Sequence, residues 1–460
     1  MIKQLAKKSS VYLAAKIIAA LVGFFTLPIL VRLISQEDIG LIVYFNSIVP
    51  LAIVLVYLGT EGAMVRLYFD HKKEDVLFSN IFFIASLMIF IILLGLLLQT
   101  LFFPSSDQVF IYIVISYIIF SGFKNYLLSY FRIKEKEKAF FVVFIFLTII
   151  LFSFQISGAY YFEDAYYVLA GKVLAELIAL VVALYFMYKH LSLKYVSKNE
   201  IYDILKYAIP ILPYAFSLYA INMTDKLFIK HFLGLNEVAV YGVAFTFIAA
   251  ISIFSSSIDM AWGPYFYKNI KDKPKEHFSR IITIVYGLLA FVAMFIILFA
   301  NEIVTLVYGL EYIDAGAILS ILMFGAFIYA FYFFPVKSIN YKRKNLYTAI
   351  LAAVVMVANI VLNYIFIINF GIMGAAIATT LSNFIFVIVL ILIAEKVFPI
   401  YYEYKSLFFI LLAVLLSLII SIYFDFSISE KVIFLIIFTL VIGVLLSRKF
   451  KQLKYFEEQA

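Results

Sequence analysis

Long apolar runs dominate this 460-residue sequence and constrain what it can fold into. A helix needs roughly 20 mainly apolar residues to cross the hydrocarbon core of a bilayer. Fourteen runs meet this length, at about 10–32, 38–60, 77–102, 109–131, 139–159, 165–187, 206–229, 237–258, 279–300, 314–336, 346–368, 372–394, 405–424 and 429–447. They are continuous rather than alternating, which indicates helices and not barrel strands. The sequence therefore predicts an all-α polytopic membrane protein with about 14 transmembrane helices.

The composition excludes several other classes of protein. Hydrophobic residues make up 66% of the chain and charged residues only 14%, whereas soluble domains carry about 25% charged residues. A soluble enzyme and a disordered chain are therefore excluded. The chain has no cysteine and only 4 histidines, which argues against disulfides, thiol chemistry and a histidine metal cage. The first run is too long for a signal peptide and lacks a small-residue cleavage site, so it is interpreted as a true span.

Basic residues are sorted between the two sides of the predicted stack of helices. By this topology 29 of the 36 Lys and Arg residues lie on one side, 4 on the other and 3 within spans. The positive-inside rule then places both termini in the cytoplasm of a multi-pass protein of the cytoplasmic (inner) membrane. Contact with anionic membrane lipids accounts for the net charge of +8, and no nucleic acid is required.

The fourteen spans divide into two pseudo-symmetric halves and an addition. At an offset of 199 residues, Asp38 to Leu41 aligns with Glu237 to Val240, and each segment opens the second span of its half. The predicted organisation is an N-lobe at 1–188 (helices 1–6), a basic cytoplasmic linker at 189–205 and a C-lobe at 206–395 (helices 7–12). Helices 13 and 14 with a basic cytoplasmic tail follow at 396–460. Parallel halves of six spans are typical of transporters that work by alternating access.

Several motifs, in order along the chain, resemble a known family. They are Ser35-Gln36-Glu37-Asp38-Ile39-Gly40 before span 2, Gly59-Thr60-Glu61-Gly62-Ala63-Met64-Val65-Arg66 after it, Asp225-Lys226 in span 7, Ala261-Trp262-Gly263-Pro264 in span 8, Tyr308-Gly309-Leu310-Glu311-Tyr312-Ile313-Asp314-Ala315 after span 9, and Asn359, Asn363-Tyr364 and Gly371-Ile372-Met373-Gly374-Ala375-Ala376-Ile377-Ala378-Thr379 in spans 11 and 12. Together they resemble the polysaccharide transporters, or O-antigen (Wzx-type) flippases, of the multidrug/oligosaccharidyl-lipid/polysaccharide exporter superfamily.

The resemblance implies a V-shaped pair of six-helix bundles around a central cavity. It also implies a flippase that moves a polyprenyl-diphosphate-linked oligosaccharide, a repeat unit of O-antigen, capsule or exopolysaccharide, from the inner to the outer leaflet. Its expected partners are this substrate, membrane lipids and the polysaccharide polymerase machinery, and the chain is expected to be a monomer without catalytic residues. The same superfamily includes cation-coupled multidrug exporters, which are the alternative function. A membrane glycosyltransferase or polymerase is less favoured, because the longest outer connection has only about a dozen residues.

Basic residues inside spans are the first candidates for a substrate site. Charged groups at membrane depth are costly and functional by default, and a diphosphate needs a cationic path. Lys16 in span 1, Lys124 in span 4 and Lys172 in span 6 are therefore predicted to bind the head group, together with Arg66 at the inner mouth. The alternatives are that Lys16 and Lys124 snorkel to the interface, and that Lys172 forms an internal ion pair with Glu176 four residues on.

Acidic residues and prolines supply candidates for coupling and gating. Glu176 is predicted to carry a coupling proton, and Asp225, near Asn222 and Thr224, to carry a proton or Na⁺. The alternative for Asp225 is an ion pair with Lys226.

Glu61 is predicted to gate the inner mouth with Arg66, unless both belong to a solvated helix end. Pro28, Pro210 and Pro213 are predicted to bend the first helix of each lobe, against the alternative of static kinks. No metal site and no cofactor are expected. No nucleotide-binding loop is present, so an H⁺ or Na⁺ gradient or the membrane potential is the expected driving force.

Overall fold

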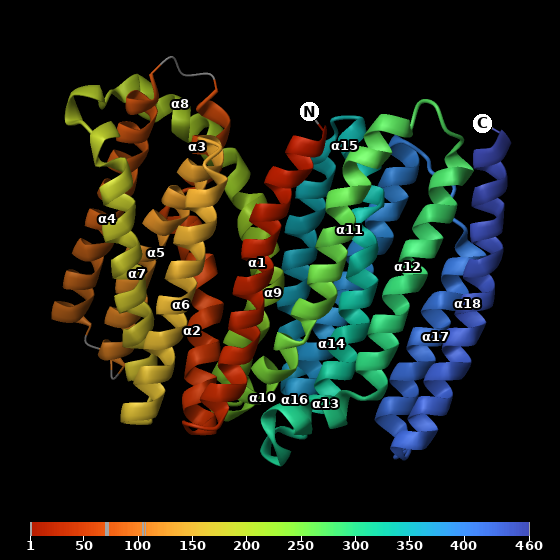
Figure 1. Cartoon of the computed structure of the whole chain (residues 1–460). Coiled ribbons are helices and arrows are strands. Elements are labelled where there is room, and N and C mark those ends of the chain that lie inside the picture. Colours follow the sequence, from red (N-terminus) through yellow and green to blue (C-terminus); the bar gives the residue numbers. More distant parts are fainter. Residues whose placement is uncertain (1, 70–72, 104, 106, 460) are drawn as a thin grey trace. The chain divides into compact units, whose positions relative to one another are not determined.

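The computed structural model describes residues 2–69, 73–103, 105 and 107–459, and the regular structure within them is helical (Figure 1). The first eight α-helices and their 3-10 turns are α1 (Ile2–Val31), α2 (Gln36–Val56), α3 (Thr60–Leu67), α4 (Glu74–Phe102), α5 (Gln108–Ile133), α6 (Glu137–Phe162), α7 (Ala165–Met187), η1 (Tyr188–His190), η2 (Leu193–Tyr195) and α8 (Lys198–Ala208). The others are η3 (Ile209–Ile211), α9 (Leu212–Phe232), α10 (Leu235–Thr246), α11 (Ile248–Asn269), α12 (Lys275–Leu298), α13 (Ala300–Tyr308), η4 (Leu310–Tyr312), α14 (Ala315–Ala330), η5 (Phe331–Phe333), α15 (Pro335–Tyr341), α16 (Asn345–Val397), α17 (Tyr404–Tyr423) and α18 (Ile428–Gln459).

The number of membrane-spanning helices agrees with the prediction. Within the described residues, twelve helices are long and apolar enough to cross a membrane, and α10 with α11 form a thirteenth across a 40° bend. Helix α16 has 53 residues and would measure about 80 Å at 1.5 Å per residue, far more than the roughly 30 Å hydrocarbon core. It contains a non-helical residue, Gly371, and is therefore two spans, 345–370 and 372–397. With these halves counted separately, the total is fourteen.

Two glycines form the sharp turn inside α16. Gly371 has φ 60° and ψ −143°, a conformation that a side chain strongly disfavours. A Cβ added to Gly374 would lie only 2.0 Å from the carbonyl oxygen of Phe366. The chain can therefore double back on itself only because both positions lack a side chain, which explains the Gly371 to Thr379 motif in structural terms.

The chain separates into two compact units, which divide between Met223 and Thr224 within α9. The first unit extends beyond the predicted N-lobe because α8 packs against α3 and α4. In the second unit α12 contacts α14, α17 and α18, and α14 also contacts α16. The last two helices, α17 and α18, are thus packed on the second unit.

In the first unit α7 is held against α6 by close backbone contact. A Cβ on Gly158 of α6 would lie 2.7 Å from the Tyr167 carbonyl oxygen, and a Cβ on Gly171 of α7 would lie 2.6 Å from that of Phe154. The two glycines thus let the helices approach at two levels.

The first turn of α7 is joined to the start of α2. The Asp38 carboxylate accepts a hydrogen bond from the Ala165 backbone N–H at 3.2 Å, and Asp164 accepts one from Tyr166 N–H at 2.7 Å. Ser35 caps α2 through Asp38 N–H. The Ser35 to Gly40 motif therefore positions α7 as well as α2.

The predicted proline bends have different outcomes. Helix α1 continues through Pro28 to Val31. The first span of the second half is interrupted, because the 3-10 turn η3, which contains Pro210, lies between α8 and α9, and Pro213 is the second residue of α9. Proline cannot donate the backbone hydrogen bond that a continuous helix needs, so this break follows from the sequence. A gating role for the three prolines stays a prediction.

Candidate functional site

A charged cluster lies inside the first unit, between α2, α5 and α7. The Glu176 side chain of α7 is only 2% exposed, and its Oε1 pairs with the Lys124 ammonium of α5. The same oxygen accepts a hydrogen bond from the Tyr117 hydroxyl at 3.2 Å. The ion pair predicted as an alternative, between Lys172 and Glu176 on the same helix, is therefore replaced by a pair between Glu176 of α7 and Lys124 of α5.

Lys172 contributes a second ammonium to this cluster but binds a neutral partner. Its Nζ donates to the Asn46 Oδ1 of α2 at 2.5 Å and lies 5.2 Å from the centre of the Phe45 ring. Lys172 is 6% exposed, whereas Asn46 is exposed, so the cluster reaches the surface of its unit at Asn46. Two ammonium groups and one carboxylate leave a formal surplus of one positive charge.

Glu176 also lines a small cavity. Oε2 is buried, and among the described side chains and backbone it has no hydrogen-bond partner. A cavity of about 40 Å³ lies here, lined by Lys124, Phe144, Leu147, Thr148, Leu151, Ala175, Glu176 and Ala179. One probe-sized water needs about 10–15 Å³ of such volume, so the cavity can hold water beside the carboxylate.

The other charged residues predicted for binding and gating in this unit lie on other helices, α1 and α3. Lys16 on α1 and Arg66 on α3 are both exposed. Glu61 accepts hydrogen bonds from Ser129 Oγ at 2.8 Å and from the Arg132 guanidinium at 3.0 Å. Glu61 thus pairs with Arg132 at the end of α5. The two residues are far apart in the sequence, and no sequence pattern indicates that they pair.

A second buried charge pair lies in the second unit. Asp225 is fully buried, and its Oδ1 accepts hydrogen bonds from the Lys226 backbone N–H at 2.8 Å and from Lys226 Nζ at 3.1 Å. Its Oδ2 accepts a hydrogen bond from the Tyr241 hydroxyl at 2.6 Å. The Lys226 ammonium also lies 3.6 Å from the centre of the Phe245 ring, a favourable cation–π arrangement. The alternative ion pair with Lys226 is therefore present.

A network of neutral polar side chains joins α9 to both halves of α16. Thr224 Oγ1 donates to Asn359 Oδ1 at 3.3 Å, and Asn359 Nδ2 donates to Ser382 Oγ at 3.0 Å. Asn363 Nδ2 also donates to Asn359 Oδ1 at 3.0 Å. The side chain of Asn222, the third residue predicted near Asp225, lies outside the described residues. The motif residues Asn359 and Asn363 thus bridge three helical segments.

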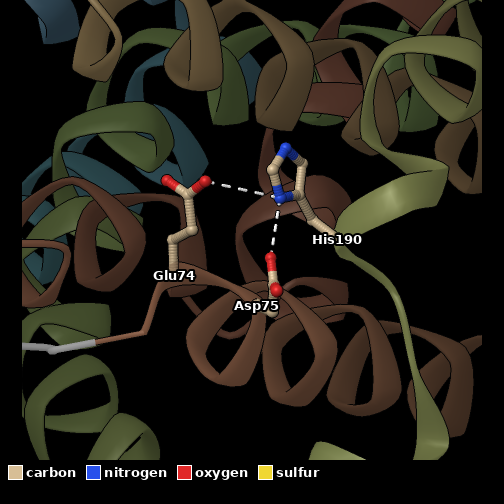
Figure 2. Close-up of side chains that lie close together, drawn as sticks. All are labelled: Glu74, Asp75 and His190. Atoms are coloured by element: carbon tan, nitrogen blue, oxygen red, sulfur yellow. Dashed lines mark hydrogen bonds and ion pairs between the residues drawn. The ribbon is translucent and has the colours of Figure 1, made fainter.

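The linker between the halves is fastened to the first turns of α4. His190 of η1 points towards Glu74 and Asp75, with Nδ1 at 2.7 Å from Asp75 Oδ1 and 3.4 Å from Glu74 Oε1 (Figure 2). Glu74 also pairs with Lys134. Although burial disfavours its charged form, the hydrogen bond to Glu74 raises the pKa of Lys134 above its ordinary value.

Two neutral side chains of α4 extend this attachment. Asn80 donates to the Tyr195 carbonyl at 2.9 Å and accepts from Ser197 N–H at 3.0 Å. Ser79 donates to the His190 carbonyl at 3.1 Å and accepts from Ser192 N–H at 2.9 Å. Glu74, Asp75 and His190 have the geometry of metal ligands, but each already has a protein partner, so the cluster is explained as a clamp on the linker.

The second unit also contains an apolar cavity of about 390 Å³ between α12, α14, α16 and α17. Among the described residues that line it, the polar side-chain atoms are the hydroxyls of Tyr286 and Tyr404, which bond to the Phe327 carbonyl and to Glu395. The described lining residues offer no counter-charge to an anionic group.

The sequence matches two known protein families. Residues 5–270 match the family model described as "Polysaccharide biosynthesis protein". The chain belongs to this family. Residues 210–365 also match the MatE family model.

Similar curated proteins include proteins of polysaccharide synthesis. Capsular polysaccharide biosynthesis protein CapF of Staphylococcus aureus is 24% identical over 415 residues, which cover 86% of this chain and 98% of CapF. The probable low-salt glycan biosynthesis flippase Agl15 of Haloferax volcanii is 30% identical over 169 residues, or 36% of each chain.

Solved structures share the fold of this family member. Lipid II flippase MurJ, in an inward closed conformation, superposes with a TM-score of 0.75 at 18% identity, over 95% of this chain and 98% of MurJ. The MATE multidrug transporter DinF-BH superposes with a TM-score of 0.60 at 16% identity, over 88% of this chain and 96% of that one. These likenesses confirm the predicted all-α architecture.

Sequence reasoning missed the neutral members of both charged sites. Tyr117, Asn46 and Tyr241 each supply a hydrogen bond to a buried charge. Asn46 is a single amide within the long apolar run of span 2, which was a usable signal. The two tyrosines are indistinguishable by sequence from the many others in the chain.

Proposed function

We propose that the chain is a flippase that moves a polyprenyl-diphosphate-linked oligosaccharide, an O-antigen, capsule or exopolysaccharide repeat unit, from the inner to the outer leaflet by alternating access. Membership in the polysaccharide biosynthesis family and the similarity to CapF and Agl15 support this substrate class. Under this proposal the chain works in the cytoplasmic membrane as a monomer, carries its substrate without chemical change and delivers it to the polymerase machinery.

The sign of the buried charge is the observation that carries the proposal. Lys124 and Lys172 outnumber Glu176 within the membrane-spanning part of the first unit. A surplus ammonium in a low-dielectric region attracts a diphosphate and repels an organic cation. Lys124 is 22% exposed and is assigned the direct contact with the phosphate. Lys172 supplies fixed positive potential, and the exposed Lys16 and Arg66 attract the head group earlier.

The membrane potential is the driving force that we propose. Exporting a negative charge from a cytoplasm held at negative potential gains about 2.3 kcal/mol per charge per 100 mV. The two acids predicted for ion coupling, Glu176 and Asp225, are each neutralised by a lysine of the chain itself. Neither then needs an external proton or Na⁺ to be stable in the membrane.

Reconstitution tests the proposal directly. Purified protein in proteoliposomes is given a fluorescent polyprenyl-diphosphate oligosaccharide, and its movement is followed by quenching or enzymatic modification of the outer-leaflet pool. We expect protein-dependent flipping that accelerates when valinomycin and a K⁺ gradient impose a potential favouring anion exit. A rate that depends on a pH or Na⁺ gradient and ignores the potential would refute the proposed driving force.

A multidrug exporter is the second candidate, favoured by the match of residues 210–365 to the MatE family. It predicts cation-gradient-dependent efflux of an organic cation such as rhodamine 6G from the same proteoliposomes. Efflux of the dye without flipping of the lipid-linked oligosaccharide would replace the first proposal by the second.

A further inference from the structure

We propose that Glu176 is an internal counter-anion, which occupies Lys124 whenever no substrate phosphate does. The inference rests on the proposed function and adds a step to it, the return of the empty transporter. Glu176 bridges from α7 to the Lys124 ammonium on α5, the group assigned to the substrate. A carboxylate and a phosphate both accept charge-assisted hydrogen bonds from an ammonium, so the acid can take the place of the head group.

The return of the transporter without substrate explains why Lys124 needs an internal anion. After the head group leaves, Lys124 stays at membrane depth, where an ammonium without a partner is strongly disfavoured. Pairing with Glu176 removes that penalty and leaves the empty site in a low-energy state. The pairing also competes with the bound diphosphate and so promotes its release on the far side.

The surroundings of Glu176 allow its ion pair with Lys124 to open when substrate binds. Its Oε1 accepts the bonds from both Lys124 and Tyr117, while Oε2 has no partner among the described atoms, and the residue lines the cavity of about 40 Å³. Water in that cavity can hydrate the carboxylate, and the Tyr117 bond remains, once Lys124 turns to the phosphate.

Lys172 stays in place through this exchange. Its ammonium is held by Asn46 and the Phe45 ring, so its position does not depend on Glu176. Of the two ammonium groups in the cluster, Lys124 is therefore the one that alternates between partners.

Transport kinetics separate the loaded step from the empty step. Net flipping, into vesicles without substrate in the opposite leaflet, requires the empty return, whereas exchange against unlabelled substrate does not. In Glu176→Gln we expect net flipping to fall about tenfold while exchange stays within about twofold of wild type, since a tenfold rate change needs only 1.4 kcal/mol in a barrier. Equal loss of net flipping and exchange, or no loss of either, would overturn the inference.

Binding of inorganic diphosphate to the purified protein gives a second readout. Removing the competing carboxylate is expected to tighten diphosphate binding about tenfold in Glu176→Gln, while Lys124→Gln weakens it. Weaker binding in Glu176→Gln would contradict the role of a competitor. Glu176→Asp, which keeps the charge, is expected to retain most of the wild-type ratio of net flipping to exchange and guards against misfolding of the Gln variant.

Glu302→Gln is the matched control, because Glu302 also pairs with a lysine, Lys431, at 2.6 Å, but in the second unit. It should leave both the kinetic ratio and the diphosphate affinity unchanged. Absence of flipping by the wild-type protein would refute the proposed function, whereas wild-type flipping with an unchanged ratio in Glu176→Gln would refute the counter-anion alone.

Discussion

At the scale of single residues, the bridge between Lys124 and Glu176 matters because its two ends sit on different helices. A charge pair on one helix would move as a unit, whereas this pair can open when an outside anion competes. Lys172, although closer to Glu176 in sequence, bonds to Asn46. The three charged groups therefore have distinct surroundings, and substitutions at each should have distinct effects.

Lys124→Gln should lower flipping of the lipid-linked oligosaccharide at least tenfold, because it removes the accessible ammonium and also leaves Glu176 buried without a cation. Lys16→Gln should reduce the rate less than threefold, since Lys16 is exposed on α1. The measurement is the initial flipping rate in proteoliposomes at matched protein content. Full transport by Lys124→Gln would count against the assigned phosphate contact.

Lys226→Met should destabilise the protein by about 3–5 kcal/mol, because it strands the Asp225 carboxylate in a fully buried position. The double variant Asp225→Asn/Lys226→Met should regain most of that loss, since no unpaired charge then remains. Thermal unfolding of the detergent-solubilised protein reports both. A double variant as unstable as the single one would show that the charge pair is not the cause.

At the scale of secondary structure, close contacts at positions without a charged side chain set where the candidate functional side chains lie. Gly171 directly precedes Lys172, and the close approach of α6 at this point fixes the level at which α7 presents its charges. Ser79 and Asn80 of α4 likewise hold the backbone of the linker through hydrogen bonds. In both cases a residue without charge determines where charged residues lie.

Gly171→Ala should lower the melting temperature, since the added Cβ would lie 2.6 Å from the Phe154 carbonyl oxygen. Overpacking of this kind costs typically about 1–3 kcal/mol. Flipping should fall as well, because α7 is pushed away from α6. The matched control is Gly95→Ala on α4, where no described atom lies within 4 Å of the added Cβ; its melting temperature should stay equal or rise.

Asn80→Ala should loosen the linker, because the Asn80 side chain bonds to the backbone of both Tyr195 and Ser197. Limited trypsin digestion is expected to cut faster at Lys194 and Lys198 than in the wild type. Asn369→Ala is the control, since the exposed Asn369 donates to the Ile365 carbonyl of its own helix. Equal cleavage of all three proteins would show that Asn80 does not hold the linker.

At the scale of the whole molecule, the sorting of basic residues predicts which loops face the cytoplasm. The natural chain contains no cysteine, so single cysteines report on sidedness without background. Asp425→Cys, in the loop between α17 and α18, should react with a membrane-impermeant maleimide on intact cells. Lys194→Cys, in the linker, should react only after permeabilisation. The reverse pattern would invert the topology and the direction of transport derived from it.

Much of the fold was predictable because it depends on local properties of the chain, namely the hydrophobicity of each segment and the backbone preferences of single residues. A run of apolar residues such as 279–300 must become a buried or lipid-facing helix wherever its neighbours lie, and α12 occupies 275–298. Proline at 210 and glycine at 371 break helices for local reasons of the same kind. The candidate site was only partly predictable. Lys124, Lys172 and Glu176 were recognised as costly charges, but their partners were not.

The sequence by itself determined the class of protein, the number of spans, the predicted sidedness and the list of charges that must be neutralised within the membrane, since all of these follow from hydrophobicity and local backbone chemistry. The tertiary structure alone decided three of the pairings: Lys124 for Glu176, Asn46 for Lys172 and Arg132 for Glu61. The reason is physical. Pairing requires a donor and an acceptor atom within about 3 Å of each other, and residues such as Lys124 and Glu176, which are 52 positions apart, meet only after the helices have packed.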